Sequence, residues 1–186
     1  GNGTLYEIQS GNISTIAGTR WINSSAQVLQ LYSLNTSSTD HGNVTTPGEA
    51  GPYIYGSGQV VNIIATPDAC YHFVNWTGDT GTIANPNASS TTIIMNGDYS
   101  IQANFVINTY DLSVVANPGA GGTPYFDSSS PFDCGTNATI HANSSSCYTF
   151  VIWTPAEGIA NTSAENTTVY MNKSRTLTAN YTVKRV

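Results

Sequence analysis

Apolar and polar residues alternate with a period of two along several short segments of the chain. In residues 100–107 every second residue from Ile101 is apolar, and residues 176–183 follow the same pattern from Leu177. Alternation of this kind, rich in β-branched and aromatic residues, predicts half-buried β-strands. The pattern predicts ten strands, at 31–36, 60–66, 71–76, 91–95, 100–107, 110–116, 137–142, 148–153, 167–171 and 176–183.

The sequence also repeats itself once. TTIIMN at 91–96 returns as TTVYMN at 167–172, and the matched segments of the two copies lie 76 to 78 residues apart. A constant offset means that both copies have the same elements in the same order. We therefore expect an all-β protein with two tandem β-sheet modules, each a small sandwich or rolled sheet. The modules span 31–107 and 108–186 and follow an extended N-terminal segment at 1–30.

Each copy has one strand that carries three aromatic rings. Exposed rings can stack on sugars, but rings that alternate with other residues in the same way in both copies are typical of a core strand. We therefore expect these rings, together with the two methionines, in the hydrophobic cores. The residues are Tyr71, Phe73, Trp76 and Met95 in the first copy and Tyr148, Phe150, Trp153 and Met171 in the second.

A longer motif surrounds these rings. The first copy contains Gly58, Val60, Ala65, Pro67, Tyr71, Phe73, Trp76, Gly78, Thr92, Met95, Gly97, Asp98, Ile101, Ala103 and Phe105. The second keeps Gly135, Ala142, Tyr148, Phe150, Trp153, Thr168, Met171, Leu177, Ala179 and Tyr181, and it departs at Ser144, Pro155 and Lys173-Ser174. This motif resembles the bacterial repeat related to internalin-type B-repeats. The resemblance implies surface-protein modules that act as spacers, adhesins or assembly units, and it implies no catalysis.

Charge is scarce in this chain. Charged residues make up 9% of it, the net charge is -6, and Lys and Arg together number 5. The basic stripe needed to bind nucleic acid is therefore missing, and no apolar run approaches the roughly 18 residues of a membrane span. The three His show no metal-ligand spacing. Asp79 and Asp98 lie in expected turns, so calcium binding there stays an open alternative. No catalytic or cofactor motif appears, so we expect a protein that is not an enzyme and holds no cofactor.

The acceptor sequence for N-glycosylation, Asn-x-Ser/Thr, is about three times as frequent as chance predicts. Dense N-linked glycans would supply the hydration that so few charges cannot, and would place the protein outside the cell or on its surface. The other explanation is that polar β-proteins are simply rich in Asn and Thr. The chain starts at Gly1, so we expect a mature secreted product whose signal peptide has been removed.

Twelve asparagines are candidate glycosylation sites: Asn2, Asn12, Asn23, Asn35, Asn43, Asn87, Asn137, Asn143, Asn161, Asn166, Asn172 and Asn180. We expect turns, and hence the best access, at Asn43, Asn87, Asn143, Asn161, Asn166 and Asn172. We expect Asn180 to be accessible on the polar face of its strand. Asn75 also lies in an acceptor sequence, but we expect it to share a face with Tyr71 and Phe73.

Three cysteines, an odd number, are informative in a secreted chain. Cys134 and Cys147 are near in sequence, but a hairpin of 137–142 with 148–153 would place them at opposite ends of a strand. Six strand residues span roughly 20 Å, whereas bridged Cα atoms lie within about 7 Å of each other. The local pair stays possible if the loop after Cys134 folds back. The alternative is a bridge between modules or subunits, so we expect at least one cysteine to be free or bonded outside its own module.

The N-terminal segment is too apolar for a disordered tail, although neither module needs it to complete its pattern. It contains Leu5, Tyr6, Ile8, Ile13, Ile16, Trp21 and Ile22. It could fold back as an edge strand on its own module, or it could add to the open edge of the next copy. A head-to-tail contact of this second kind propagates as a filament. We therefore expect a homopolymer, as the structural subunit of a filament, thread or sheath; the alternative is an adhesin or carbohydrate-binding fragment of a larger surface protein.

Overall fold

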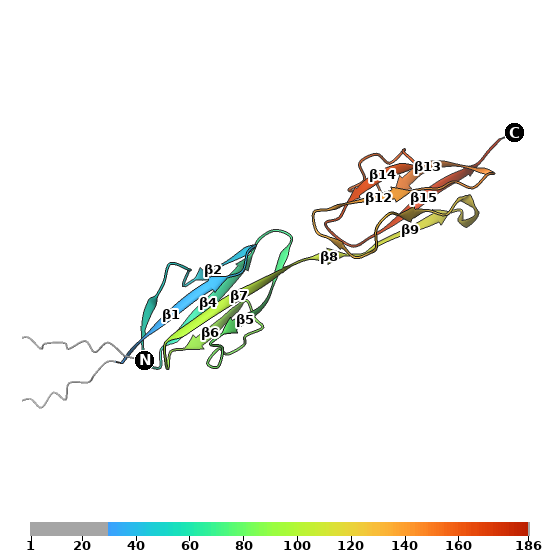
Figure 1. The fold of residues 1–186 in the computed structure, drawn as a ribbon. Coiled ribbons are helices and arrows are strands. Elements are labelled where there is room, and N and C mark those ends of the chain that lie inside the picture. Colours follow the sequence, from blue (N-terminus) through green and yellow to red (C-terminus); the bar gives the residue numbers. More distant parts are fainter. Residues whose placement is uncertain (1–29, 186) are drawn as a thin grey trace, which may run out of the picture. The chain divides into compact units, whose positions relative to one another are not determined.

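The computed structural model describes residues 30–185, which form two compact units made almost entirely of β-strands (Figure 1). Unit 1 comprises 30–68 and 73–106, and unit 2 comprises 69–72 and 107–185. The N-terminal residues predicted to contact another subunit, and Asn2, Asn12 and Asn23, lie outside the described residues. No helix within residues 30–185 is long and apolar enough to cross a membrane.

Unit 1 is a sandwich of two sheets around one core. Its strands are β1 (Leu31–Ser38), β2 (Gly42–Thr46), β3 (Tyr53–Gly56), β4 (Val60–Pro67), β5 (Tyr71–Gly78), β6 (Ser90–Ile94) and β7 (Tyr99–Ile107). One sheet has the order β3-β1-β7-β5 and the other has the order β2-β4-β6. Leu34 and Ile101 of the first sheet share the core with Ile63 and Ile93 of the second, because the period of two turns these side chains inward.

Unit 2 repeats this plan with shorter edges. Its elements are β8 (Thr109–Tyr110), β9 (Leu112–Asn117), the 3-10 turn η1 (Gly119–Gly121), β10 (Tyr125–Phe126), β11 (Phe132–Asp133), β12 (Asn137–His141), β13 (Tyr148–Thr154), β14 (Asn166–Tyr170) and β15 (Arg175–Val183). The sheet β13-β15-β9 packs against β10-β12-β14, and β11 pairs with β8. The predicted fold class, all-β with tandem sandwich-like modules, is confirmed.

The sequence pattern missed the edge strands. All ten predicted strands are present within two residues at each end, but β2, β3, β10 and β11 were not predicted. These four are short, and each pairs with a single neighbour. Strands of two to four residues, as in β3, β10 and β11, do not hold enough alternation to stand out, so pairing rather than local sequence makes them strands.

An irregularity in β13 explains the spacing of the aromatic rings. Phe150 and Trp153 are 8% and 0% exposed, although a regular strand would turn residues three apart to opposite faces. The register of β13 with β15 shifts between Phe150 and Ile152, which is a β-bulge. In β5, Phe73 packs on the core and Trp76 is 2% exposed with the same spacing. The expected core positions are confirmed for Trp76, Phe150, Trp153, Met95 and Met171, while Tyr71, Phe73 and Tyr148 are half-buried.

The buried tryptophans also hold the connection that follows them. The Trp153 indole Nε1–H donates to the carbonyl of Ala164 at 3.1 Å, and its backbone N–H donates to Thr162 at 2.8 Å. Trp76 makes the same two bonds to Ala88 and Pro86. A large ring that is buried with its polar group bonded is a strong anchor, so these long connections are pinned to the cores.

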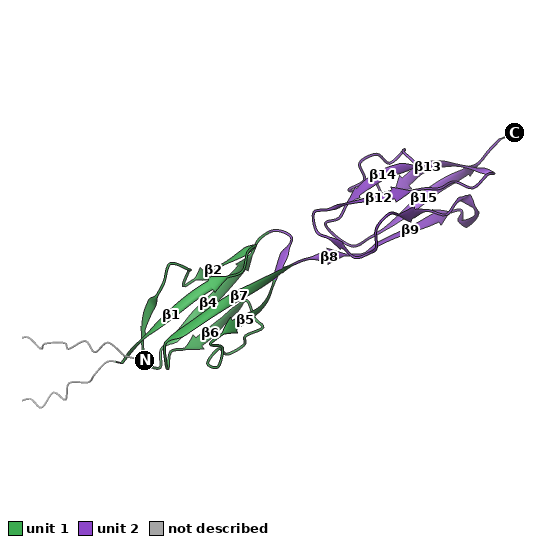
Figure 2. Cartoon of the chain, in the orientation of Figure 1, with its two compact units in different colours: residues 1–68, 73–106 green, residues 69–72, 107–186 purple. Residues whose placement is uncertain are grey.

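A disulfide joins Cys70 to Cys134, which are 64 residues apart in sequence. Cys70 lies in the turn between β4 and β5, in residues 69–72, and this short segment belongs to unit 2 (Figure 2). The Asn108 N–H donates to the Cys70 carbonyl and the Cys134 N–H donates to the Asn108 carbonyl, both at 2.8 Å. The local pair of Cys134 with Cys147 is therefore wrong, because Cys134 is bonded to the other repeat. Cys147 is free and exposed, which agrees with the expectation that at least one cysteine is free or bonded outside its own module.

Replacing Cys70 and Cys134 together with Ser is expected to lower the free energy of unfolding of unit 2 by about 2–4 kcal/mol, because the bridge closes a long loop in the unfolded chain. Thermal unfolding followed by circular dichroism measures this change. Cys147→Ser is the matched control and is expected to leave the midpoint unchanged. Equal midpoints for the double variant and the control would contradict the prediction.

Candidate functional site

The outward face of β12 and β14 gathers two predicted glycosylation sites. Alternate residues of each strand point outward, because Ala138, Ile140 and Val169 between them are buried in the core. The outward residues are Asn137, Thr139 and His141 on β12 and Asn166, Thr168 and Tyr170 on β14. We call this set the β12–β14 outer face. In each acceptor sequence the Asn and the Thr are two positions apart, so both side chains point the same way, toward solvent.

The strand register places these residues in three opposing pairs, Asn137 with Tyr170, Thr139 with Thr168, and His141 with Asn166. The N–H of Ala142 donates to Glu165, whereas the N–H of Tyr170 donates away from β12, to Gly158. The three outward pairs are therefore the non-hydrogen-bonded pairs of an antiparallel ladder, in which opposing side chains come closest.

His141 sits at the centre of a small polar network on this face. Its Nδ1 lies 2.8 Å from Oδ1 of Asn166, and its Nε2 lies 2.8 Å from Oδ1 of Asp127. The ring stacks on Tyr125 of β10, with centroids 4.5 Å apart. The hydrogen bond to Asp127, and then the one to Asn166, raise the pKa of His141 above its ordinary value. Both acceptors favour a ring with both nitrogens protonated.

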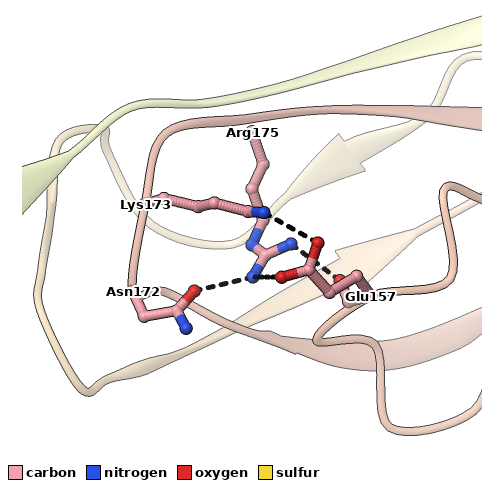
Figure 3. Close-up of polar contacts among 4 residues, drawn as sticks. All are labelled: Glu157, Asn172, Lys173 and Arg175. Atoms are coloured by element: carbon pink, nitrogen blue, oxygen red, sulfur yellow. Dashed lines mark hydrogen bonds and ion pairs between the residues drawn. The ribbon is translucent and has the colours of Figure 1, made fainter.

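A second polar cluster orients Asn172 beside the start of β15 (Figure 3). The Arg175 side chain is only 4% exposed. It donates from Nη1 to the carbonyl of Glu157 and from Nη2 to Oδ1 of Asn172, each at 2.7 Å. Figure 3 shows the amide nitrogen of Asn172 turned away from the guanidinium. Lys173 bonds Glu157 at 2.7 Å and lowers the pKa of that carboxyl group. The buried guanidinium thus fixes the amide that would carry a sugar.

Most of the described sites are open to solvent. Exposed asparagines are Asn35, Asn43, Asn87, Asn137, Asn143, Asn161, Asn166 and Asn172. Asn180 is half-buried instead, and its Nδ2 donates to the Ile152 carbonyl and to Thr154. The expected free access of Asn180 was therefore wrong, because neighbouring strands flank it. Asn75 is also half-buried.

Two predicted turn sites lie in strands. Asn43 belongs to β2 and Asn166 belongs to β14, and both are exposed because they occupy the outward face of an outer strand. The sequence pattern also did not single out Tyr125 and Tyr170 as neighbours of glycosylation sites. The repeat offset relates Asn137 and Tyr170 to Val60 and Ile94 of the first copy, but the pairing within each copy is a property of the folded sheet.

Asp79 and Asp98, the two turn aspartates considered for calcium, accept hydrogen bonds from backbone N–H groups. Oδ1 of Asp98 accepts the N–H and the Oγ–H of Ser33 at 2.8 and 2.9 Å, which lowers the pKa of Asp98. In the second copy the residue types are exchanged but the direction is kept, since Oγ of Ser174 accepts the N–H of Asp111. Asp79 likewise accepts a backbone N–H. Within residues 30–185 no three His, Cys, Asp or Glu side chains are grouped to hold a metal ion.

The fold and this surface define a small β-sandwich repeat, built around a bulged Phe-x-x-Trp strand. The comparison with known protein families matches the divergent InlB B-repeat domain at residues 32–109 and again at 112–185. The chain therefore belongs to this family, and the resemblance stated from the sequence is confirmed. The family is a repeat domain typical of bacterial surface proteins, and it is not an enzyme family. A search of the curated proteins found no match.

The stability of unit 2 is expected to depend on pH through His141. The folded-state pKa of His141 is raised, so its contribution is complete below the unfolded pKa of about 6.5 and is lost as pH rises through the folded pKa. The loss should stay below about 1 kcal/mol, since Asp127 is exposed. Unfolding midpoints at pH 5.5 and 8.5 measure it. His141→Gln should remove this part of the pH dependence; an unchanged dependence in that variant would contradict the assignment.

Glycan occupancy is expected to follow exposure of the asparagine amide. Asn137, Asn161 and Asn172 should carry sugar in most molecules, whereas Asn180 should carry little, because attachment would break the hydrogen bonds of its Nδ2. Glycopeptide mass spectrometry of protein from its native source measures each site. Equal occupancy at Asn180 and Asn137 would refute the dependence on exposure, and an intact mass equal to the bare 19.7 kDa chain would refute glycosylation itself.

Proposed function

We propose that the chain is a structural subunit of an extracellular or cell-surface assembly, such as a filament, thread or sheath. In this proposal the subunit carries N-linked glycans and joins the next copy by strand donation. Residues 1–30 of one copy supply the strand, and the edge strand β9 of the next copy receives it. The observation that supports this recipient is a length of backbone along β9 whose outward N–H groups have no hydrogen-bond partner within residues 30–185.

β9 lies at the end of the sheet β13-β15-β9 and pairs in parallel with β15. The Arg175 N–H donates to the carbonyl of Asp111, so odd-numbered residues of this strand face β15. The even-numbered residues of β9 therefore direct their N–H and C=O groups away from β15; these are Leu112, Val114 and Ala116. The Leu112 N–H already donates to Oγ of Ser130. The open edge is therefore at Val114 and Ala116, whose side chains are half-buried against the core.

The outer side of β14 and the unit 1 counterpart of β9 are better protected. The outer edge of β14 is covered by the preceding connection, because the Ala160 N–H donates to Thr168 and the Tyr170 N–H donates to Gly158. In unit 1, β1 lies inside a four-stranded sheet, with β3 on its other side, whereas its counterpart β9 ends a three-stranded one. An open edge beside a hydrophobic core is suited to an added strand, whose backbone pairs while alternate side chains pack inward.

Family membership and surface chemistry support the rest of the proposal. Repeats of this family are typical of bacterial surface proteins. The hollow between the segments around Ala120 and Ser144 is lined by small residues and has no ring on which a sugar could stack. The exposed acceptor asparagines are spread over strands and connections of both units. These features fit a glycan-covered building element better than a ligand-binding site.

Two variants separate the donor from the recipient. Deleting residues 1–20 removes the donated strand, and Val114→Pro removes an outward N–H without touching a bond to β15. Each variant alone is expected to stay folded and monomeric, while an equimolar mixture forms a one-to-one complex, because each supplies the part that the other lacks. Negative-stain microscopy and analytical ultracentrifugation measure assembly. Val114→Ala keeps the N–H and is the matched control, which should polymerise like the unchanged chain.

Polymers formed by the truncated chain would exclude strand donation. Polymers formed by Val114→Pro alone would exclude β9 as the recipient while leaving donation by residues 1–20 in place. Isolated particles of the unchanged chain under all conditions would favour an adhesin or carbohydrate-binding fragment of a larger surface protein.

A further inference from the structure

Asn137 and Tyr170 face each other on the β12–β14 outer face, as a close, non-hydrogen-bonded pair. Tyr170 is 42% exposed, so its ring presents apolar surface to solvent on this face. Thr139, the hydroxyl residue of the same acceptor sequence, points outward beside them. A sugar on Nδ2 of Asn137 would therefore start within side-chain reach of the ring.

The first copy offers a natural comparison. The counterparts of Asn137 and Tyr170 are Val60 and Ile94, which also oppose each other across two strands. Both are exposed, at 59% and 41%, and neither an acceptor asparagine nor a ring is present there. The second copy thus contains the asparagine and the ring together, at positions that are paired only in the folded sheet.

We propose that the ring of Tyr170 is an intramolecular binding surface for the first pyranose of the glycan on Asn137. The C–H face of the sugar packs on the π-face of the ring, which carries partial negative charge, and covers apolar surface that is otherwise exposed. The inference rests on the glycosylation in the proposed function. It adds that this glycan is held against β14 and does not move freely in solvent.

The other end of the same face has the matching arrangement. Asn166 opposes His141, whose ring stacks on Tyr125. Because β12 and β14 are antiparallel, the two acceptor asparagines lie on different strands at opposite ends of the face. Oδ1 of Asn166 faces His141, which leaves its Nδ2 for the sugar. Asn43 lacks this arrangement, since it opposes Thr66 on β4.

A double-mutant cycle tests the proposal. Asn137→Gln removes the sugar, and Tyr170→Ile replaces the ring with the residue of the first copy and keeps a strand-forming side chain. In glycosylated protein each change should lower the unfolding midpoint of unit 2 by about 2–4 °C, and the double variant should be no lower than either single one. In protein made by a host that attaches no N-glycans, this coupling should vanish.

Two controls make the result specific. The same cycle with Asn43→Gln and Thr66→Val should show no glycan-dependent coupling, because no ring faces that site. Nuclear Overhauser contacts between the Tyr170 ring and the first sugar should appear in glycosylated protein. Occupied Asn137 with additive midpoints and no such contacts would overturn this inference alone. Acceptor asparagines that are bare throughout the native protein would overturn the glycosylation in the proposed function as well.

Discussion

The buried tryptophan of the Phe-x-x-Trp strand is the contact on which much of each unit depends. In unit 2 the bulge lets Phe150 and Trp153 enter one core from one strand, and the indole and backbone N–H groups of Trp153 then hold the connection that follows. That connection returns along β14 and bonds Thr168 and Tyr170. The edge of β14 is thus closed, and its outward side chains have fixed positions. This anchor therefore supports the strand that carries half of the β12–β14 outer face.

The two copies use one framework for different surfaces. Inward residues keep their character, as Met95 and Met171 show, because both are fully buried in equivalent places. Outward residues are free to change, since packing does not constrain them. The pair Val60 and Ile94 has become Asn137 and Tyr170, and the bond from Ser33 to Asp98 has become one from Asp111 to Ser174. A repeated fold therefore carries different chemistry without a change of architecture.

Because charged residues make up only 9% of the chain, most of its polar contacts are hydrogen bonds that involve neutral groups. Arg175, one of 5 Lys and Arg in the chain, is buried, and backbone and amide oxygens accept its hydrogen bonds. A buried cation needs such partners, because its loss of hydration is costly. Neutral Asn, Ser and Thr side chains supply most of the other contacts between strands and connections. Such a surface depends on hydration from uncharged groups, which is the property that N-linked glycans would add.

The sequence by itself determined the inward faces, the two-copy plan and the family, because a period of two and a constant offset are local and can be read along the chain. Strand length also argued against the local pair of Cys134 with Cys147, but it left that pair open and could not identify Cys70 as the partner of Cys134. Tertiary structure decided which strands are neighbours, and with them the Cys70–Cys134 bridge, the short edge strands and the partial burial of Asn180. Alternation fixes the face on which a side chain lies, but the residue across from it depends on pairing between segments distant in sequence. For that reason the acceptor asparagines could be named from the sequence, while the rings beside them appeared only in the folded sheet.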